Sequence, residues 1–270
     1  MRFHADDLGA SPAITRAVLD CYTAGAISSC SVLINRQPFE QLVEALQPHP
    51  GLGLRLHLNL SEGYALTEAP RLCRPDGSFR HSFQSLALDY LFSPQRAELR
   101  RQLQAELEAQ CHRYGQLLAA LGRSAEVGLD SHEHFHFLPF VFEAVSQLAG
   151  QFAVVSLRLP PRTVFLSHFT PASPVPLLKA LVLTGLGRWL HSRWPYQAPR
   201  LLVTGTVDPF RLDIDQAGEV IFHPGQLAPD ESGPPQPRLA RAYRAEHRKL
   251  EHEALLRFTA GRAARNGAGL

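Results

Sequence analysis

The stretch HADDLGASPAITRAVLDCYTAGA, residues 4–26, joins a short apolar run, a polar turn and a helical pattern. Ser11 is a candidate N-cap, because its hydroxyl can accept a hydrogen bond from a backbone N–H of the first turn. Pro12 occupies the first helical position and Gly25 follows the last one, as helix ends favour. A strand followed by a helix is the unit of parallel α/β folds.

The same alternation continues along the chain. Further strands are predicted over 29–35, 53–60, 126–130, 152–160 and 219–225, and further helices over 38–49, 93–122 and 139–149. The long helix rests on apolar residues that recur every three to four positions, namely Leu99, Leu103, Leu107, Cys111, Tyr114 and Leu118. We expect an α/β protein with one catalytic domain over 1–270, including a surface loop at 228–238 and a C-terminal helix at 239–260.

Composition excludes several classes of protein. A formal charge of +2 argues against a dedicated nucleic-acid binder, and no DNA- or RNA-binding motif is present. The basic residues at 96–101 and 238–249 are mixed with Glu and indicate solvated helix faces. Four cysteines without CxxC spacing indicate buried or half-buried thiols in a reducing compartment.

The start of the chain has no secretory signal pattern. The most apolar stretch of the whole sequence, 174–190, is interrupted by Lys179, Gly185, Gly187 and Arg188. It falls short of the roughly 20 apolar residues that a membrane span needs. We expect a cytoplasmic protein.

Acidic and histidine side chains lie where the apolar runs end. These are Asp6 and Asp7, His57, Asp130 with His132, and His223. In parallel α/β folds the carboxyl ends of the strands form the active-site face, so we expect these residues at one edge of the sheet.

Asp6 and Asp7 need a specific explanation, because adjacent carboxylates repel each other. One Asp would suffice for a helix cap or an Asx turn. Two allow a division of labour in which one binds a cation and the other acts as a base beside it.

The segment DSHEHFH, residues 130–136, favours a metal site. In an extended chain Asp130, His132, His134 and His136 would share a face. In a helix only His132 and His136 would do so. Whether His134 and His136 take part is left open.

Five segments taken together resemble the YdjC-like carbohydrate deacetylase family, which includes the chitooligosaccharide deacetylases. The segments are HADDLG, GLRLHLNL, DSHEHFH, RLP (158–160) and FHPG. The motifs span residues 3 to 226 in order, with Leu8 where the family usually has Phe. The resemblance implies a (β/α) barrel-like fold with parallel strands, such as a distorted TIM barrel. It also implies Asp7, His57 and His132 as metal ligands and Asp6 as general base. His223 is similar to the family's general acid, and Arg158 to an arginine near the acidic pair.

The chemistry of the residues agrees with these roles. Two His and one Asp leave coordination positions open for water and substrate, and Mg²⁺ and Zn²⁺ both fit. The expected enzyme is a hydrolase of amide C–N bonds in carbohydrate metabolism. It removes an N-acetyl group from an amino sugar or oligosaccharide, with Asp6 activating a metal-bound water.

The segment 177–194 bears on the substrate, because it resembles hopanoid-associated relatives more than chitobiose-type enzymes. It is interpreted as a buried or lid helix. Alternatively, an apolar face with Trp189 and Trp194 would receive a lipid-linked amino sugar or touch a membrane surface.

Two different functions for the same ligand set stay open. Two His and a carboxylate also define the iron site of certain oxygenases, although Asp6 would then lack a role. A non-catalytic member would bind metal or sugar only. The expected partner is a small acetylated sugar. The exact substrate, the native metal and the oligomeric state, for which a homodimer is one option, are not determined by the sequence.

Overall fold

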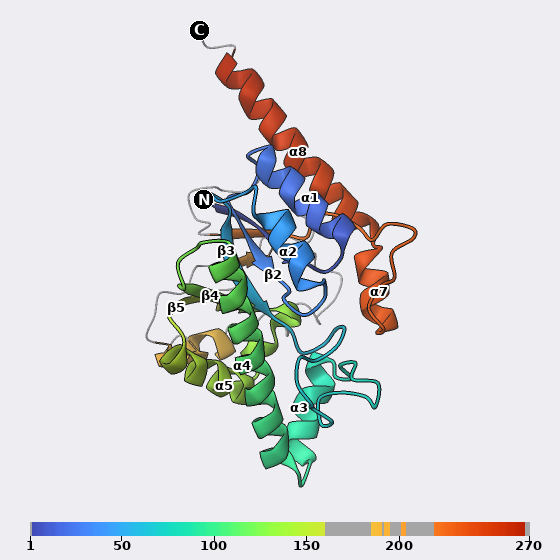
Figure 1. Ribbon diagram of the computed structural model, residues 1–270, viewed down its shortest axis with the longest axis vertical. Coiled ribbons are helices and arrows are strands. Elements are labelled where there is room, and N and C mark those ends of the chain that lie inside the picture. The colour runs from blue at the N-terminus through green and yellow to red at the C-terminus, as the bar shows by residue number, and fades with distance from the viewer. Residues whose placement is uncertain (1, 160–184, 191, 195–200, 204–218, 268–270) are drawn as a thin grey trace.

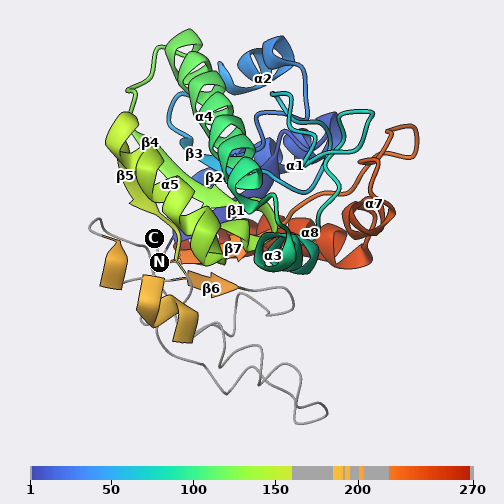
Figure 2. The same ribbon diagram turned by 90° about the horizontal axis from the view of Figure 1, so that it is seen from below.

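A computed structural model describes residues 2–159, 185–190, 192–194, 201–203 and 219–267. Its strands form one seven-stranded sheet in the order β5-β4-β3-β2-β1-β7-β6, and every pair is parallel. Their bounds are β1 Arg2–Leu8, β2 Ser29–Val32, β3 Gly53–Leu58, β4 Val127–Ser131, β5 Val154–Leu157, β6 Leu201–Val203 and β7 Glu219–Phe222. The sheet curves from β5 round to β6 (Figure 2), and the described residues show no pairing between these two strands. The predicted parallel, barrel-like α/β class is confirmed.

Helices pack around the sheet (Figure 1). Their bounds are α1 Pro12–Thr23, α2 Phe39–Leu46, α3 Phe83–Phe92, α4 Arg96–Ala120, α5 Pro139–Gln151, α7 Pro237–Tyr243 and α8 Glu246–Gly267, and a 3₁₀ segment, η1, covers His132–Phe137. The long helix α4 contacts α2, α3 and α5, whereas α8 packs on α1. Helix α8 therefore brings the end of the sequence back to the first βα unit.

The ends of α1 follow from local sequence. The Ser11 hydroxyl accepts a hydrogen bond from the backbone N–H of Ile14, and Pro12 is the first helical residue. Gly25 has φ of 75°, which suits a residue without Cβ just past the helix. The predicted capping is confirmed here.

Three details differ from the sequence prediction. The expected single helix at 239–260 is divided, since α7 ends at Tyr243 and α8 begins at Glu246. Helix α3 and strand β6 were not predicted. Strand β6 has three residues, too few for an alternating pattern to stand out. All four cysteines are buried and free, as expected.

Residues 177–184 and 191 of segment 177–194 lie outside the described residues. Of its two tryptophans, Trp194 is 6% exposed and packs on Phe142 of α5, and Trp189 is partly buried against the same ring. The alternative prediction of an exposed apolar face formed by both tryptophans is therefore wrong, because Trp194 belongs to the core. None of the helices in the described residues is long and apolar enough to cross a membrane.

Candidate metal centre

A bulge near the end of β1 separates the two adjacent aspartates. The pairing of β1 with β2 is regular through Ala5 and shifts in register before Leu8. Asp7 has φ of 70°, in the left-handed region that residues other than glycine seldom adopt. Bulges re-aim side chains and are common beside active sites. Asp6 and Asp7 consequently contact different partners.

Asp7 meets two histidines from other strands. Its Oδ1 lies 3.5 Å from Nε2 of His57 and 3.1 Å from Nδ1 of His132. One candidate ligand atom from each residue lies within 4.8 Å of the other two. His57 is in β3 and His132 directly follows β4, so the ends of parallel strands assemble the three residues. The structure thus brings the three predicted metal ligands together.

Two of the three side chains are held from behind at hydrogen-bond distance. Arg248 of α8 donates from Nη1 to Oδ2 of Asp7 over 2.8 Å. The Oδ1 of Asp130 lies 2.6 Å from Nδ1 of His57, the residue that it pairs with across β3 and β4. These contacts leave one carboxylate oxygen and two imidazole nitrogens facing one another. That donor set fits a divalent cation.

Asp6 belongs to a second buried cluster. Arg158 donates from Nη1 to both carboxylate oxygens of Asp6, over 3.0 and 2.9 Å, and lies 2.8 Å from Oδ2 of Asp130. The Nε2 of His4 is 3.4 Å from Asp6, and Nε2 of His223 is 3.9 Å away. The structure therefore places Asp6, Arg158 and His223 together, next to the Asp7 cluster.

Charge controls protonation in both clusters. Burial opposes ionisation of Asp7 and Asp6, but Arg248 and Arg158, respectively, hold the pKa of each carboxyl well below its usual range. Burial also disfavours a charged His57, yet Asp130 and Asp6 raise the pKa of His57 to about 10. The negative electrostatic potential that favours protonation of the buried His57 ring would also attract a metal cation.

His223 directly follows β7 and remains accessible to solvent. Its side chain is 32% exposed, and its backbone N–H donates to Oε2 of Glu251 in α8 over 2.5 Å. Desolvation by the surrounding protein lowers the pKa of His223 to about 4, although Asp7 and Asp6 act in the opposite direction. The ring is therefore neutral near pH 7.

The three histidines of DSHEHFH do not share one face. Glu133 and His134 have φ of 53° and 60°, so η1 is neither extended nor a regular helix. Both geometries predicted for this segment are therefore wrong. Of the three rings, the one that faces Asp7 is His132.

The remaining histidines near the site have protein partners. The ring of His136 bonds to the Ser131 hydroxyl and the Arg158 carbonyl oxygen, over 2.5 Å each. His134 stacks on Phe137. His4 bonds to the hydroxyls of two serines in β2 through both ring nitrogens.

The sequence indicated no functional role for Arg248. It lies in the segment 238–249, whose mixed charges indicate a solvated helix face, yet it is 4% exposed. Its guanidinium also lies over the Tyr243 ring, 4.8 Å from the centroid. No local signal distinguishes it from the exposed residues around it, since only the packing of α8 buries it. Glu62 and Glu219 are further buried carboxylates for which the sequence predicts no role.

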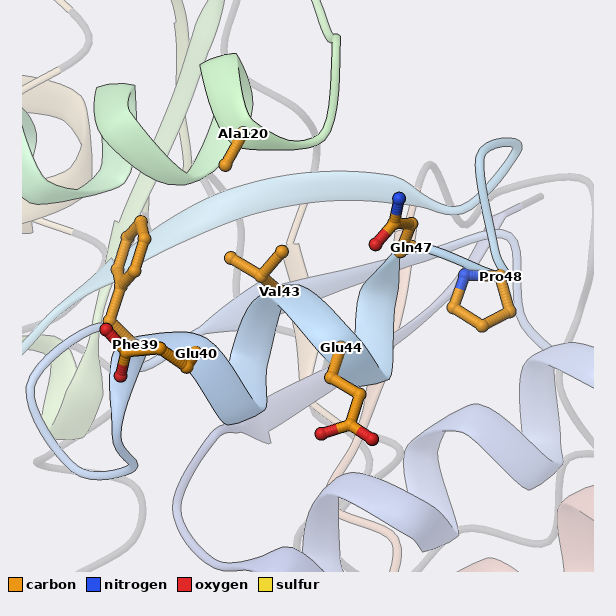
Figure 3. Close-up of a pocket in the computed structure, with 7 residues that line it drawn as sticks. All are labelled: Phe39, Glu40, Val43, Glu44, Gln47, Pro48 and Ala120. Carbon is orange, nitrogen blue, oxygen red and sulfur yellow. The ribbon is translucent and has the colours of Figure 1, made fainter.

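A groove of about 610 Å³ lies elsewhere, between α2 and the end of α4 (Figure 3). It is lined by residues of α2 together with Pro48 and Ala120. None of the candidate metal ligands lines it. The groove is therefore separate from the polar centre.

Comparisons with known proteins agree with the motifs. Residues 1–263 match the family model described as YdjC-like protein. Curated relatives named carbohydrate deacetylase include proteins from Brevibacillus brevis, 30% identical over 56% of this chain and 56% of the relative, and from Geobacillus stearothermophilus, 29% identical over 60% and 58%. A relative of the same name from Mus musculus is 33% identical over 58% of this chain and 49% of the relative. The chain thus spans about half the length of the curated relatives it matches.

One solved structure is similar across nearly the whole chain. It is a crystal structure from Enterococcus faecalis, of a protein with a proposed role in cellobiose-phosphate cleavage. The TM-score is 0.56 at 18% sequence identity, and the match covers 94% of each chain. At that identity the likeness supports the fold.

Proposed function

Because the chain belongs to the YdjC-like protein family, we propose that it is a metal-dependent hydrolase that removes an N-acetyl group from an amino sugar or oligosaccharide. Relatives named carbohydrate deacetylase support this substrate class. The observation that carries the proposal is the division of the acidic pair. Asp7 faces two histidines, whereas Asp6 lies beside them with its own arginine.

In this proposal Asp7, His57 and His132 hold one divalent cation, either Mg²⁺ or Zn²⁺. When bound, the cation supplies Lewis acidity toward the amide carbonyl and lowers the pKa of water. Arg248 and Asp130 keep two of the ligands oriented before the cation arrives. Preorganised ligands avoid the cost of ordering them during the reaction.

Asp6 acts as the general base. It is ionised, because Arg158 holds its pKa well below the usual range. A low pKa makes Asp6 a weak base, so it depends on a water whose own pKa is lowered at the adjacent site. Arg158 also fixes the orientation of the carboxylate through two hydrogen bonds.

His223 delivers a proton to the departing nitrogen. The water oxygen bonds to the carbonyl carbon, the C–N bond breaks, and acetate and a free amine result. His223 is neutral near pH 7, so it first receives the proton that Asp6 has taken from the water, and its Nε2 is 3.9 Å from the Asp6 carboxylate. Its exposure places the ring where a substrate can reach it.

Acetate release by the metal-loaded protein tests the proposal. The substrates would be N-acetylated oligosaccharides and a lipid-linked amino sugar, each assayed with wild type and Asp6→Asn. We expect release by wild type and a loss of about 10²- to 10⁴-fold in Asp6→Asn. The matched control is Glu98→Gln, which removes an exposed carboxylate on α4 and should leave the rate unchanged.

The same panel separates the substrate classes and a non-catalytic role. Preference for the lipid-linked compound would identify that substrate class. Equal activity of wild type and Asp6→Asn would exclude Asp6 as the base. Metal binding without acetate release from any compound would favour a binding-only protein.

A further inference from the structure

The two candidate histidine ligands turn opposite ring nitrogens toward Asp7. His57 presents Nε2, at 3.5 Å from the Asp7 carboxylate, and His132 presents Nδ1, at 3.1 Å. A neutral imidazole carries its proton on one nitrogen and has a lone pair on the other. The ring atom that faces away from Asp7 therefore decides whether the ring can bind a cation there.

Behind His57, Asp130 is firmly fixed. It is fully buried, and its Oδ1 lies 2.6 Å from Nδ1 of His57. Its other oxygen accepts a hydrogen bond from the Ser31 hydroxyl over 2.5 Å and faces Arg158 at 2.8 Å. A carboxylate held in this way accepts the N–H at Nδ1 of His57, and Nε2 is the ring nitrogen that faces Asp7.

Behind His132, Glu62 occupies the equivalent place. Its side chain is fully buried, and Oε2 lies 3.5 Å from Nε2 of His132. That ring nitrogen has no hydrogen-bond partner among the described residues. Arg36 is an ion-pair partner on the other side of Glu62, with Nε 3.4 Å from Oε1.

We propose that Asp130 and Glu62 are positioning residues that hold a proton on Nδ1 of His57 and on Nε2 of His132. The cation is then met by Nε2 of His57 and Nδ1 of His132. This inference rests on the metal site of the proposed function. Metal-bound histidines characteristically donate their other N–H to such an acceptor, which fixes the tautomer and the ring orientation.

The two carboxylates contribute unequally. Asp130 contacts His57 at hydrogen-bond distance and is oriented by two further groups, whereas Glu62 stands 3.5 Å from His132. Loss of an outer carboxylate characteristically costs about 10- to 100-fold in metal affinity. We expect Asp130→Asn to lower the metal affinity by about 100-fold and Glu62→Gln to lower it by about 10-fold.

Zn²⁺ titration calorimetry of the full chain measures these affinities. The matched controls are Asp89→Asn, which removes a carboxylate paired with Arg71, and Glu106→Gln, which alters a buried carboxylate that binds the 66–67 backbone. Both controls should keep the wild-type affinity. Equal losses in the controls and in the two test variants would overturn the inference, because the effect would then be general destabilisation.

Histidine ¹⁵N spectra of the Zn²⁺-loaded wild type give an independent measurement. We expect protonated Nδ1 in His57 and protonated Nε2 in His132. The same ring nitrogen protonated in both residues would overturn the inference, and so would a wild type that binds no Zn²⁺. Zn²⁺ bound through the expected nitrogens without acetate release would refute the proposed activity and leave the inference intact.

Discussion

Asp6 and Asp7 are neighbours in the chain but belong to two differently built clusters. Asp6 faces Arg158, which follows β5 and also contacts Asp130 and Glu219, so this cluster is closed on itself. Asp7 faces Arg248 with one oxygen and two histidines with the other, so this cluster has an open position. In the closed cluster one guanidinium lies among three carboxylates, whereas in the open cluster a carboxylate oxygen and two imidazole nitrogens face one another.

The largest expected effect is in the closed cluster. Arg158→Met leaves Asp6, Asp130 and Glu219 without their shared guanidinium. Unpaired buried charge is strongly destabilising, and we expect a loss of about 3–5 kcal/mol in the free energy of unfolding. Urea denaturation measures this loss, which Zn²⁺ should not reverse. A variant as stable as wild type would show that the cluster is not held by Arg158.

The open cluster should respond differently to the same change. Arg248→Met removes the partner of Asp7 Oδ2, and we expect a loss near the lower end of that range, about 3 kcal/mol, without metal. Saturating Zn²⁺ should reduce the difference in the free energy of unfolding between the variant and wild type, because a cation can replace the lost positive charge next to Asp7. Urea denaturation with and without Zn²⁺ measures both differences. If the stability difference between Arg248→Met and wild type is the same with and without Zn²⁺, the two clusters do not differ in their response to a cation.

Glu251 tests a carboxylate at the border of the site. Desolvation raises its pKa to about 7 from 4.5, despite the His223 backbone N–H. Because the folded protein holds the Glu251 proton more tightly than the unfolded chain does, protonated Glu251 contributes stability that is fully present below about pH 4.5. This contribution is lost as the pH rises through about 7. The contribution of Glu251 should fall by about 2 kcal/mol between pH 5 and pH 7.

Glu251→Gln removes that titration while keeping an oxygen that can accept the His223 N–H. Unfolding measured at a series of pH values should therefore show a weaker decline in the variant than in wild type. An unchanged profile would assign the decline to groups elsewhere in the protein.

The smallest effect is expected outside both clusters. Arg100 and Glu143 join α4 to α5 by an ion pair at 2.9 Å, with side chains 46% and 53% exposed. Solvent screens such a pair, so Arg100→Met should change the free energy of unfolding by less than about 1 kcal/mol. A loss as large as that of Arg158→Met would contradict the view that burial decides the strength of these ion pairs.

Local signals explain which elements could be predicted from the sequence. Helix α1 carries its cap and its proline in consecutive residues, and α4 repeats apolar residues over 25 positions. At the division of the tail, 244–245, the side chain of the distant Gln226 donates to the backbone carbonyl oxygens of Arg244 and Ala245. The amphipathic pattern of the tail continues across the break, so the sequence indicated one helix.

The candidate site shows the same limit. The family resemblance singled out Asp7, His57 and His132 as metal ligands, and the convergence of strand ends in a parallel sheet agrees with that choice. The pairing of Asp130 with His57 depends on the register between β3 and β4. The alternation of DSHEHFH gave no sign of the left-handed residues that separate its histidines.

The sequence by itself determined the α/β class, the alternation of strands and helices, the family motifs and the residues that gather at one edge of the sheet. These depend on periodicity and on short motifs, which are properties of neighbouring residues. The family resemblance placed Arg158 near the acidic pair, but only the tertiary structure decided that Arg158 contacts Asp6 and Arg248 contacts Asp7. It also decided which nitrogen each histidine turns toward Asp7. Such pairings join residues far apart in the chain, and only strand register, a bulge in β1 and the return of α8 bring them within hydrogen-bond distance.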